Sequence, residues 1–463
     1  MTRNLALKIS QVFLFSILIL SCSTDEMQAI DDGGVVVGEE NENDNSNNTL
    51  HPNILLLIAD DMSLDATPNY APELNAIKPE MPNLESLMNT GLVFDNLWSY
   101  ALCSPTRASI LTGKHGLHTD VLSPIQSLLS SNHQSLQSYI DQETNNAYAH
   151  AVFGKWHLGA SVTHPTQDMG IGTYAGNLGG GVNDYWEYDL VQNEILSALT
   201  STTEAEKKEN YSTTKYTQLA IDWKNQQTKP WFLWVAYNAA HTPFHRPDDE
   251  LISATSRAKN ENNTSNYLAM LEAMDYEMGR LIDSMTESEK ANTIVIFIGD
   301  NGTPKRVGQF ADTDKHRKGS IYQGGINVPL VVSGLNTRTG RESNALIHTV
   351  DLYATIAEIA GVTSKERYNS RSFKDLLSNE NAQTSGYVYT EVPGGTDNGS
   401  YTVRNKTYKL IYEIDTDKKE LYNLIDDKYE TADLMNKTSL TSAESIALQA
   451  LIAEGSRIRS ENF

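Results

Sequence analysis

Four short apolar segments, each followed at once by polar or charged residues, constrain the fold of this chain more than any other feature. Each segment has the length and the continuous apolar character of a strand that is buried on both faces. Longer helical patterns separate the segments, which favours an α/β fold with a large, mostly parallel mixed sheet flanked by helices. The segments are residues 53–59, 148–153, 231–237 and 293–298.

The residues that follow these four segments are candidates for a single active site. In open α/β sheets, ligands bind beyond the carboxyl ends of the strands, where these residues would meet. An acidic pair or a Gly-Asp-Asn-Gly run can also be an ordinary turn. The prediction of an active site therefore depends on all four segments being followed by such residues. Asp60, Asp61, Asp300 and Asn301 offer carboxylate and amide oxygens. Such a set suits Ca²⁺ or Mg²⁺ better than Zn²⁺, which prefers histidine and cysteine.

The first 50 residues have the composition of a leader and a tether. Arg3 and Lys8 precede an apolar run at 12–20, and the Ile-Leu-Ser-Cys sequence at 19–22 resembles a bacterial lipobox. We interpret 1–21 as a lipoprotein signal peptide, Cys22 as the lipidated residue, and 22–50, which is acidic and rich in Asn and Gly, as a flexible tether. An ordinary signal peptide with an incidental Cys22 is the alternative. The first interpretation predicts an exported bacterial lipoprotein, periplasmic or on the outer cell surface, anchored to the membrane through its lipid.

Composition divides the rest of the chain into residues 51–373 and 374–463. The first part is expected to be the catalytic domain, with a core helix at 266–285 whose apolar residues recur at three- and four-residue steps. The second part has tyrosine-rich alternating segments, which predict a small antiparallel sheet, and then a helical pattern at 442–458. The formal net charge of −23 argues against nucleic acid as a partner, because phosphate binding needs a basic face.

One of the two cysteines, Cys103, lies in a Cys-Ser-Pro-Thr-Arg pattern that is followed by Leu-Thr-Gly at 111–113. If Cys22 carries a lipid, Cys103 has no disulfide partner in an oxidising compartment. A free cysteine is most often a small buried apolar residue, and that remains the alternative. The pattern resembles the signature of the formylglycine-dependent sulfatases of the alkaline phosphatase-like superfamily. Thr106 stands where these enzymes usually carry serine.

The resemblance extends to the residues after the other strands and implies a complete site. Asp60, Asp61, Asp300 and Asn301 match the ligands of one Ca²⁺ ion, and an oxygen of the modified Cys103 would complete its shell. A formylglycine-generating enzyme would convert Cys103 to 3-oxoalanine (formylglycine). The matched catalytic residues are Cys103, Arg107, Lys155, His157, His241 and Lys318.

The resemblance also implies a role for each basic residue. Lys155 and Lys318, together with the cation, would stabilise charge on the sulfuryl oxygens, and Arg107 would hold residue 103. His241 would protonate the departing alcohol, and His157 would help to release sulfate from residue 103.

The substrate implied is a sulfated carbohydrate, either a polysaccharide or its oligosaccharides. His115, just after the Cys103 motif, and the pair His245-Arg246 are weaker candidates for substrate binding, and the pair could equally be exposed on a loop. Two other functions stay open: a phosphonate or phosphodiester hydrolase of the same superfamily, and a catalytically silent glycan-binding lipoprotein. The metal set lacks the extra His and Asp of a two-metal phosphatase, and no catalytic position is missing, so both are disfavoured.

Overall fold

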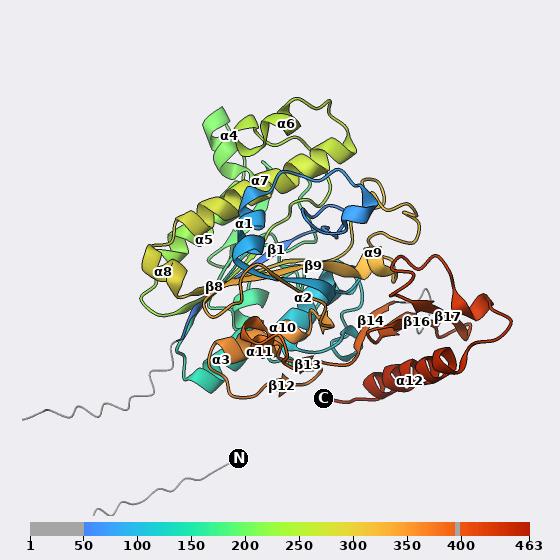
Figure 1. Cartoon of the computed structure of the whole chain (residues 1–463). Helices are drawn as coiled ribbons and strands as arrows, with labels where there is room; N and C mark the ends of the chain where they lie inside the picture. The colour runs from blue at the N-terminus through green and yellow to red at the C-terminus, as the bar shows by residue number, and fades with distance from the viewer. Residues whose placement is uncertain (1–50, 394–398) are drawn as a thin grey trace, which may run out of the picture. The chain divides into compact units, whose positions relative to one another are not determined.

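An eleven-stranded sheet forms the centre of the computed structural model, which describes residues 51–393 and 399–463 (Figure 1). The predicted leader, tether and Cys22 lie outside the described residues. The strands lie in the order β10-β2-β9-β8-β1-β7-β3-β4-β5-β6, with β11 beside β2. Their bounds are β1 Asn53–Ala59, β2 Gly91–Trp98, β3 Ala149–Gly154, β4 Thr173–Gly176, β5 Asp189–Gln192, β6 Ile195–Ala198, β7 Trp231–Ala236, β8 Thr293–Gly299, β9 Asn327–Gly334, β10 Arg341–Ser343 and β11 Ile347–His348.

The four predicted strands are the centre of this sheet. β1 pairs in parallel with β7 and β8, and β7 pairs in parallel with β3. β9 is antiparallel to both β8 and β2, which makes the sheet mixed. The predicted fold class is therefore confirmed, and the carboxyl ends of β1, β3, β7 and β8 lie at one edge, as the sequence analysis required.

Alternate residues of the buried strands feed two separate cores. In β1, Leu55 and Leu57 pack with the helices on one face, whereas Leu56 and Ile58 pack with those on the other. The helices α1, α5 and α7 cover the first face and α2, α3 and α10 cover the second (Figure 1). The helix bounds are α1 Pro82–Thr90, α2 Cys103–Thr112, α3 Leu136–Thr144, α4 Glu204–Asn210, α5 Ser212–Lys224, α6 Ala254–Arg257, α7 Asn263–Asp283, α8 Glu287–Ala291, α9 Gln323–Ile326, α10 Asp351–Ile359, α11 Lys374–Ser378 and α12 Ser442–Arg459.

The C-terminal residues form the predicted small sheet and helix. Strands β14 to β17 make an antiparallel meander in chain order, and α12 packs its apolar side against it (Figure 1). Among the described residues, no helix has both the length and the apolar character that a membrane span requires. The strand bounds are β14 Val388–Val392, β15 Ser400–Arg404, β16 Tyr408–Glu413 and β17 Lys418–Asn423, and a two-stranded ribbon joins β12 Glu366–Arg367 to β13 Ser370–Arg371.

A fully buried ion pair joins this small sheet to the segment that carries Lys318. Lys409 of β16 pairs with Glu430, and both side chains have no exposed surface. Lys409 Nζ also donates to the carbonyl oxygen of Ile321 at 2.9 Å, and Glu430 accepts from the backbone N–H of Gln323 at 2.7 Å. The C-terminal sheet thus holds the chain on the carboxyl-terminal side of Lys318.

We expect Lys409→Met to lower the free energy of unfolding by about 3–5 kcal/mol, because it leaves the Glu430 carboxylate buried without its partner. Urea unfolding would measure the change. The matched control is Lys418→Met in β17, whose ion pairs are exposed and whose loss should cost less than about 1 kcal/mol. Adding Glu430→Gln to Lys409→Met should recover part of the stability. A loss in Lys409→Met no larger than that of the control would contradict the assigned role.

Candidate active site

Three buried carboxylates form the base of the site at the carboxyl edge of the sheet. Asp60 and Asp61 follow β1, and Asp300 follows the neighbouring strand β8. One carboxylate oxygen from each residue lies within 4.8 Å of the others, and all three side chains are buried. The backbone N–H of Asp61 donates to Asp300 Oδ1 at 3.0 Å. The parallel pairing of β1 with β8 therefore brings the predicted ligands together.

The cluster has the donor atoms that a hard cation needs. Asp60 Oδ1 and Asn301 Oδ1 are buried and have no hydrogen-bond partner in the described structure. The amide nitrogen of Asn301 donates to Asp61 Oδ1 at 2.7 Å, which leaves its oxygen free to act as a ligand. Buried oxygens without partners are costly, and a divalent ion with oxygen ligands would satisfy them. The residues present therefore fit a cation such as Ca²⁺ or Mg²⁺.

Three basic side chains balance the three carboxylates. Lys155, after β3, pairs with Asp60, and Lys318 Nζ lies 2.5 Å from Asp61 Oδ1. Arg107 Nη2 donates to Asp300 Oδ2 at 2.8 Å. Burial opposes the charge on Lys318, but the nearby carboxylates, Asp61 above all, outweigh it and raise the pKa of Lys318. The three carboxylates and the three basic side chains therefore carry no net charge together. A bound divalent ion would make the site positive.

Cys103 is the first residue of α2, beside this cluster. It is buried, and its Sγ lies 3.2 Å from His157 Nδ1. Burial raises the pKa of the Cys103 thiol, although Lys155 and Lys318 oppose the change. Burial also lowers the pKa of His157 to about 3, with Lys155 and Arg107 adding to the shift. If Cys103 is converted to 3-oxoalanine, as the sequence resemblance implies, its Cβ becomes the aldehyde carbon and the aldehyde oxygen would stand where this sulfur stands.

The hydroxyl of Thr106 makes hydrogen bonds that serine could also make, which explains why threonine can stand where the motif usually has serine. Its Oγ1 donates to the carbonyl oxygen of Asp300 at 2.8 Å and accepts from the backbone N–H of Tyr100 at 3.1 Å. Both bonds need only a hydroxyl on Cβ, which serine and threonine share. Thr106 thus ties the start of α2 to the end of β8.

His241 follows β7 and is held to the metal-binding loop by the backbone. The N–H of Ala240 donates to the carbonyl oxygen of Asp60 at 2.9 Å, and the N–H of His241 donates to that of Asn238 at 2.7 Å. The ring Nδ1 lies 2.8 Å from the carbonyl oxygen of Thr242, which leaves Nε2 as the nitrogen free for a substrate. Arg107, Lys155 and Lys318 therefore contact the carboxylates directly, and His241 is linked to them through the backbone. Cys103 and His157 contact each other at the start of α2, the helix that also carries Arg107.

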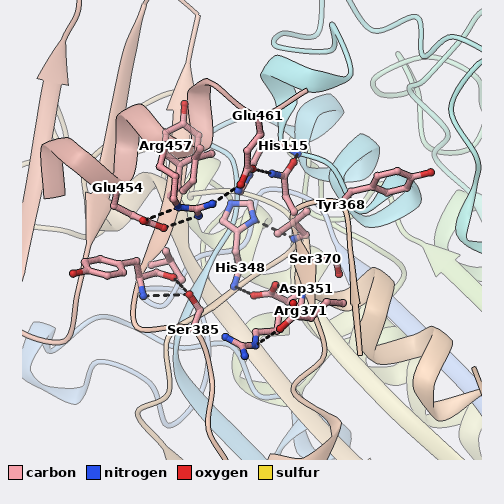
Figure 2. A pocket seen from close by; sticks show the side chains of 17 residues that line it. His115, His348, Asp351, Tyr368, Ser370, Arg371, Ser385, Glu454, Arg457 and Glu461 are labelled. Carbon is pink, nitrogen blue, oxygen red and sulfur yellow. Dashed lines mark hydrogen bonds and ion pairs between the residues drawn. The ribbon is translucent and has the colours of Figure 1, made fainter. Parts of the chain in front are cut away.

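The structure does not bring His115 to this cluster, although its position just after the Cys103 motif predicted a place near the mouth of the same pocket. Cys103 begins α2 and His115 lies beyond the other end of this ten-residue helix, about 15 Å away. His115 lines a different cavity, of about 270 Å³. Figure 2 shows it there beside His348 and Arg457. Its Nδ1 lies 2.9 Å from the hydroxyl of Tyr100. His115 is near Cys103 along the chain but far from it in space, because the whole of α2 separates the two residues.

His245 and Arg246 also have structural partners away from the carboxylate cluster. The His245 ring packs against Tyr185 with centroids 4.3 Å apart and planes tilted by 48°, and its Nε2 lies 3.1 Å from the Tyr211 hydroxyl. Burial lowers the pKa of His245 to about 4. Arg246 Nη2 donates to Asp249 Oδ1 and to the carbonyl oxygen of Arg257. These contacts make His245 a packing residue behind His241 and fix Arg246 within its own loop.

Sequence reasoning missed a loop that contacts both histidines. Gly180 lies against the His157 ring and Gly181 against the His241 ring. The run of three glycines at 179–181 is a visible signal, because consecutive glycines often mark a close approach of the backbone.

The fold and the site together have the carboxylates that a divalent cation would need and basic side chains that suit an anionic group. Comparison with known families makes the class specific: the Sulfatase family matches residues 52–362, and the C-terminal region of N-sulphoglucosamine sulphohydrolase matches residues 312–454. The chain belongs to the sulfatase family.

Curated relatives agree with this assignment. Mouse arylsulfatase J is 28% identical over 340 residues, which cover 67% of this chain and 53% of that protein. A sulfatase of Formosa agariphila is 25% identical over 86% of this chain and 87% of its own length. Human N-acetylgalactosamine-6-sulfatase is 27% identical over 67% of this chain and 62% of its own. The chain thus spans about half to nearly nine tenths of these relatives.

Solved structures share the fold. Ps i-CgsB in complex with a neocarrahexaose has a TM-score of 0.71 at 20% identity and covers 89% of this chain and 94% of its own. BT4656 in complex with its substrate, D-glucosamine-2-N,6-O-disulfate, has the same TM-score and identity and covers 89% and 99%.

Proposed function

We propose that this sulfatase hydrolyses sulfate esters of a carbohydrate, with Cys103 converted to 3-oxoalanine and one Ca²⁺ bound by Asp60, Asp61, Asp300 and Asn301. The observation that carries the proposal is the position of Cys103 at the start of α2, beside the buried carboxylates and the three basic side chains. When present, the cation and the aldehyde would supply an activated oxygen nucleophile at neutral pH.

The basic residues of the chain suit a sulfate group. Lys155 and Lys318 can direct their ammonium groups at sulfuryl oxygens, where charge develops during the reaction. Arg107 is buried and pairs with Asp300, and its Nη1 donates to the carbonyl oxygen of Lys155 at 3.0 Å. Arg107 therefore holds Asp300 and the backbone of Lys155 in place within the cluster. His157 Nδ1, at 3.2 Å from the Cys103 sulfur, is placed to move a proton at residue 103.

A sugar substrate is supported by the relatives, whose names include an N-acetylgalactosamine-6-sulfatase and whose neighbours in fold include proteins solved with a neocarrahexaose and a glucosamine disulfate. We further propose that the chain is exported and anchored through a lipid on Cys22. The support for that proposal is the leader pattern at 1–22. A formylglycine-generating enzyme would then act on Cys103 during maturation.

His241→Ala should slow the release of sulfate from sugars far more than from 4-nitrophenyl sulfate. Sugar alcohols depart poorly without a proton, so losing general acid catalysis should cost about 10²–10⁴-fold for them, whereas nitrophenolate departs unaided. Steady-state assays with both substrates give the two ratios. His245→Ala is the control, because His245 packs behind His241 without sharing its free Nε2. Equal rate losses for the two substrates in His241→Ala would contradict the role of His241 as the acid.

A further inference from the structure

Two adjacent glycines touch the rings of two different catalytic histidines. A Cβ atom built on Gly180 would lie 2.4 Å from Cε1 and 2.6 Å from Nε2 of His157. A Cβ atom on Gly181 would lie 2.9 Å from Nδ1 and 3.0 Å from Cε1 of His241. Neither glycine has a left-handed backbone, so the need for glycine comes from the close approach and not from φ.

The loop that carries these glycines is held from below by Asn177, whose side chain is buried. Asn177 Nδ2 donates to the carbonyl oxygens of Gly179 at 2.9 Å and Gly181 at 3.4 Å. Its Oδ1 accepts from Asn238 Nδ2 at 3.0 Å and from the Tyr216 hydroxyl at 3.1 Å. One amide therefore connects the loop to the turn after β7.

The segments that carry His157 and His241 are hydrogen-bonded to the loop and to residues next to it. The N–H of His157 donates to the carbonyl oxygen of Leu178 at 3.0 Å. The Tyr185 hydroxyl lies 2.7 Å from the carbonyl oxygen of Asn238 and 2.6 Å from that of His241. Hydrogen bonds thus link the loop, the backbone of His157 and the backbone of His241, and an added methyl group would press on the two rings.

We propose that Gly180 and Gly181 are positioning residues, each of which sets the ring of one catalytic histidine. The inference rests on the proposed function, because that function gives the two rings their separate tasks. His157 has Cys103 at its Nδ1 edge and Gly180 at its Cε1–Nε2 edge. Gly181 lies at the Nδ1–Cε1 edge of His241, next to the free Nε2.

The two glycines should therefore be separable by experiment. An alanine at 180 would push the His157 ring or strain its contact with residue 103, and an alanine at 181 would turn Nε2 of His241 away from the substrate. Displacement of a catalytic group by about 1 Å can cost about 10²-fold in rate. Gly179→Ala is a matched control in the same loop, since its added Cβ would meet only the Gly181 carbonyl oxygen, at an ordinary 3.7 Å.

The test is to compare Gly179→Ala, Gly180→Ala and Gly181→Ala on 4-nitrophenyl sulfate and on a sulfated sugar that the wild type hydrolyses. Gly181→Ala should lose at least about 10-fold more rate on the sugar than on the aryl sulfate, as a weakened general acid would. Gly180→Ala should lose at least about 10-fold on both, and Gly179→Ala should stay within about 3-fold of wild type.

Crystal structures of the three variants supply a readout that does not depend on turnover. The distance from His157 Nδ1 to residue 103 should lengthen only in Gly180→Ala, and the His241 ring should turn only in Gly181→Ala. The inference fails if both variants match Gly179→Ala in rates and ring positions, or if all three lose activity and melting temperature together. If the wild type released no sulfate, the proposed function would fail, and the ring positions would still decide the positioning role.

Discussion

Cys103→Ser is expected to abolish sulfate release, with a loss of at least about 10³-fold, comparable to the loss of a catalytic nucleophile in other hydrolases. The aldehyde carbon of 3-oxoalanine can carry two hydroxyl groups when hydrated, whereas serine has one. Serine nearly matches cysteine in size and Cys103 is buried at the start of α2, so the fold should persist. The variant must be made in a host whose maturation enzyme does not act on serine.

Ser104→Ala is the matched control for this prediction. Ser104 is the next residue of α2, and its Oγ is buried without a partner in the described structure. Its removal should leave both the maturation of Cys103 and the rate of turnover close to wild type. Turnover near wild type in Cys103→Ser, with an unchanged melting temperature, would refute the assignment of Cys103 as the nucleophile.

Asp60→Asn should weaken Ca²⁺ binding by at least about 100-fold, since even outer partners of metal ligands contribute about 10–100-fold. The amide keeps the size of the side chain but removes the charge that faces the cation and Lys155. Calorimetric titration of Ca²⁺ into the apoprotein measures this without any need for turnover. A chelator should inactivate the wild type, and added Ca²⁺ should restore it.

Asp65→Asn supplies the control for the metal prediction. Asp65 is equally buried and comes four residues after Asp61, but it accepts from Thr303 Oγ1 at 2.6 Å and from the Gln309 N–H at 2.8 Å instead of joining the cluster. Because Asp65 is not part of the carboxylate cluster, loss of its charge should leave the Ca²⁺ affinity close to that of wild type. Equal Ca²⁺ affinities for Asp60→Asn and wild type would overturn the assigned ligands.

The sequence predicted the centre of the fold well because buried parallel strands have a strong signal. β1 was placed with its observed bounds, and β3, β7 and β8 within one residue at each end. The core helix expected at 266–285 begins instead at Asn263, because Asn262 and Ser265 form a capping box that precedes the apolar stripe.

The sequence could not predict the contacts of residues that do not directly follow a buried strand. The site residues after strands could be predicted because β-sheet topology brings those positions together. His115 could not be placed, since its distance from Cys103 depends on the direction of α2. Gly180 and Gly181 escaped notice because their importance lies in what their missing side chains leave room for, and only coordinates show the two rings.

The most direct test of the central claim is the release of inorganic sulfate from a panel of defined sulfated oligosaccharides. The enzyme should be made together with a formylglycine-generating enzyme, and ion chromatography should quantify the product against Cys103→Ser. We expect at least one sulfated sugar to lose sulfate only with the mature enzyme and only with Ca²⁺ present. Release of phosphate or phosphonate products from matched esters, without sulfate from any sugar in the panel, would contradict the account.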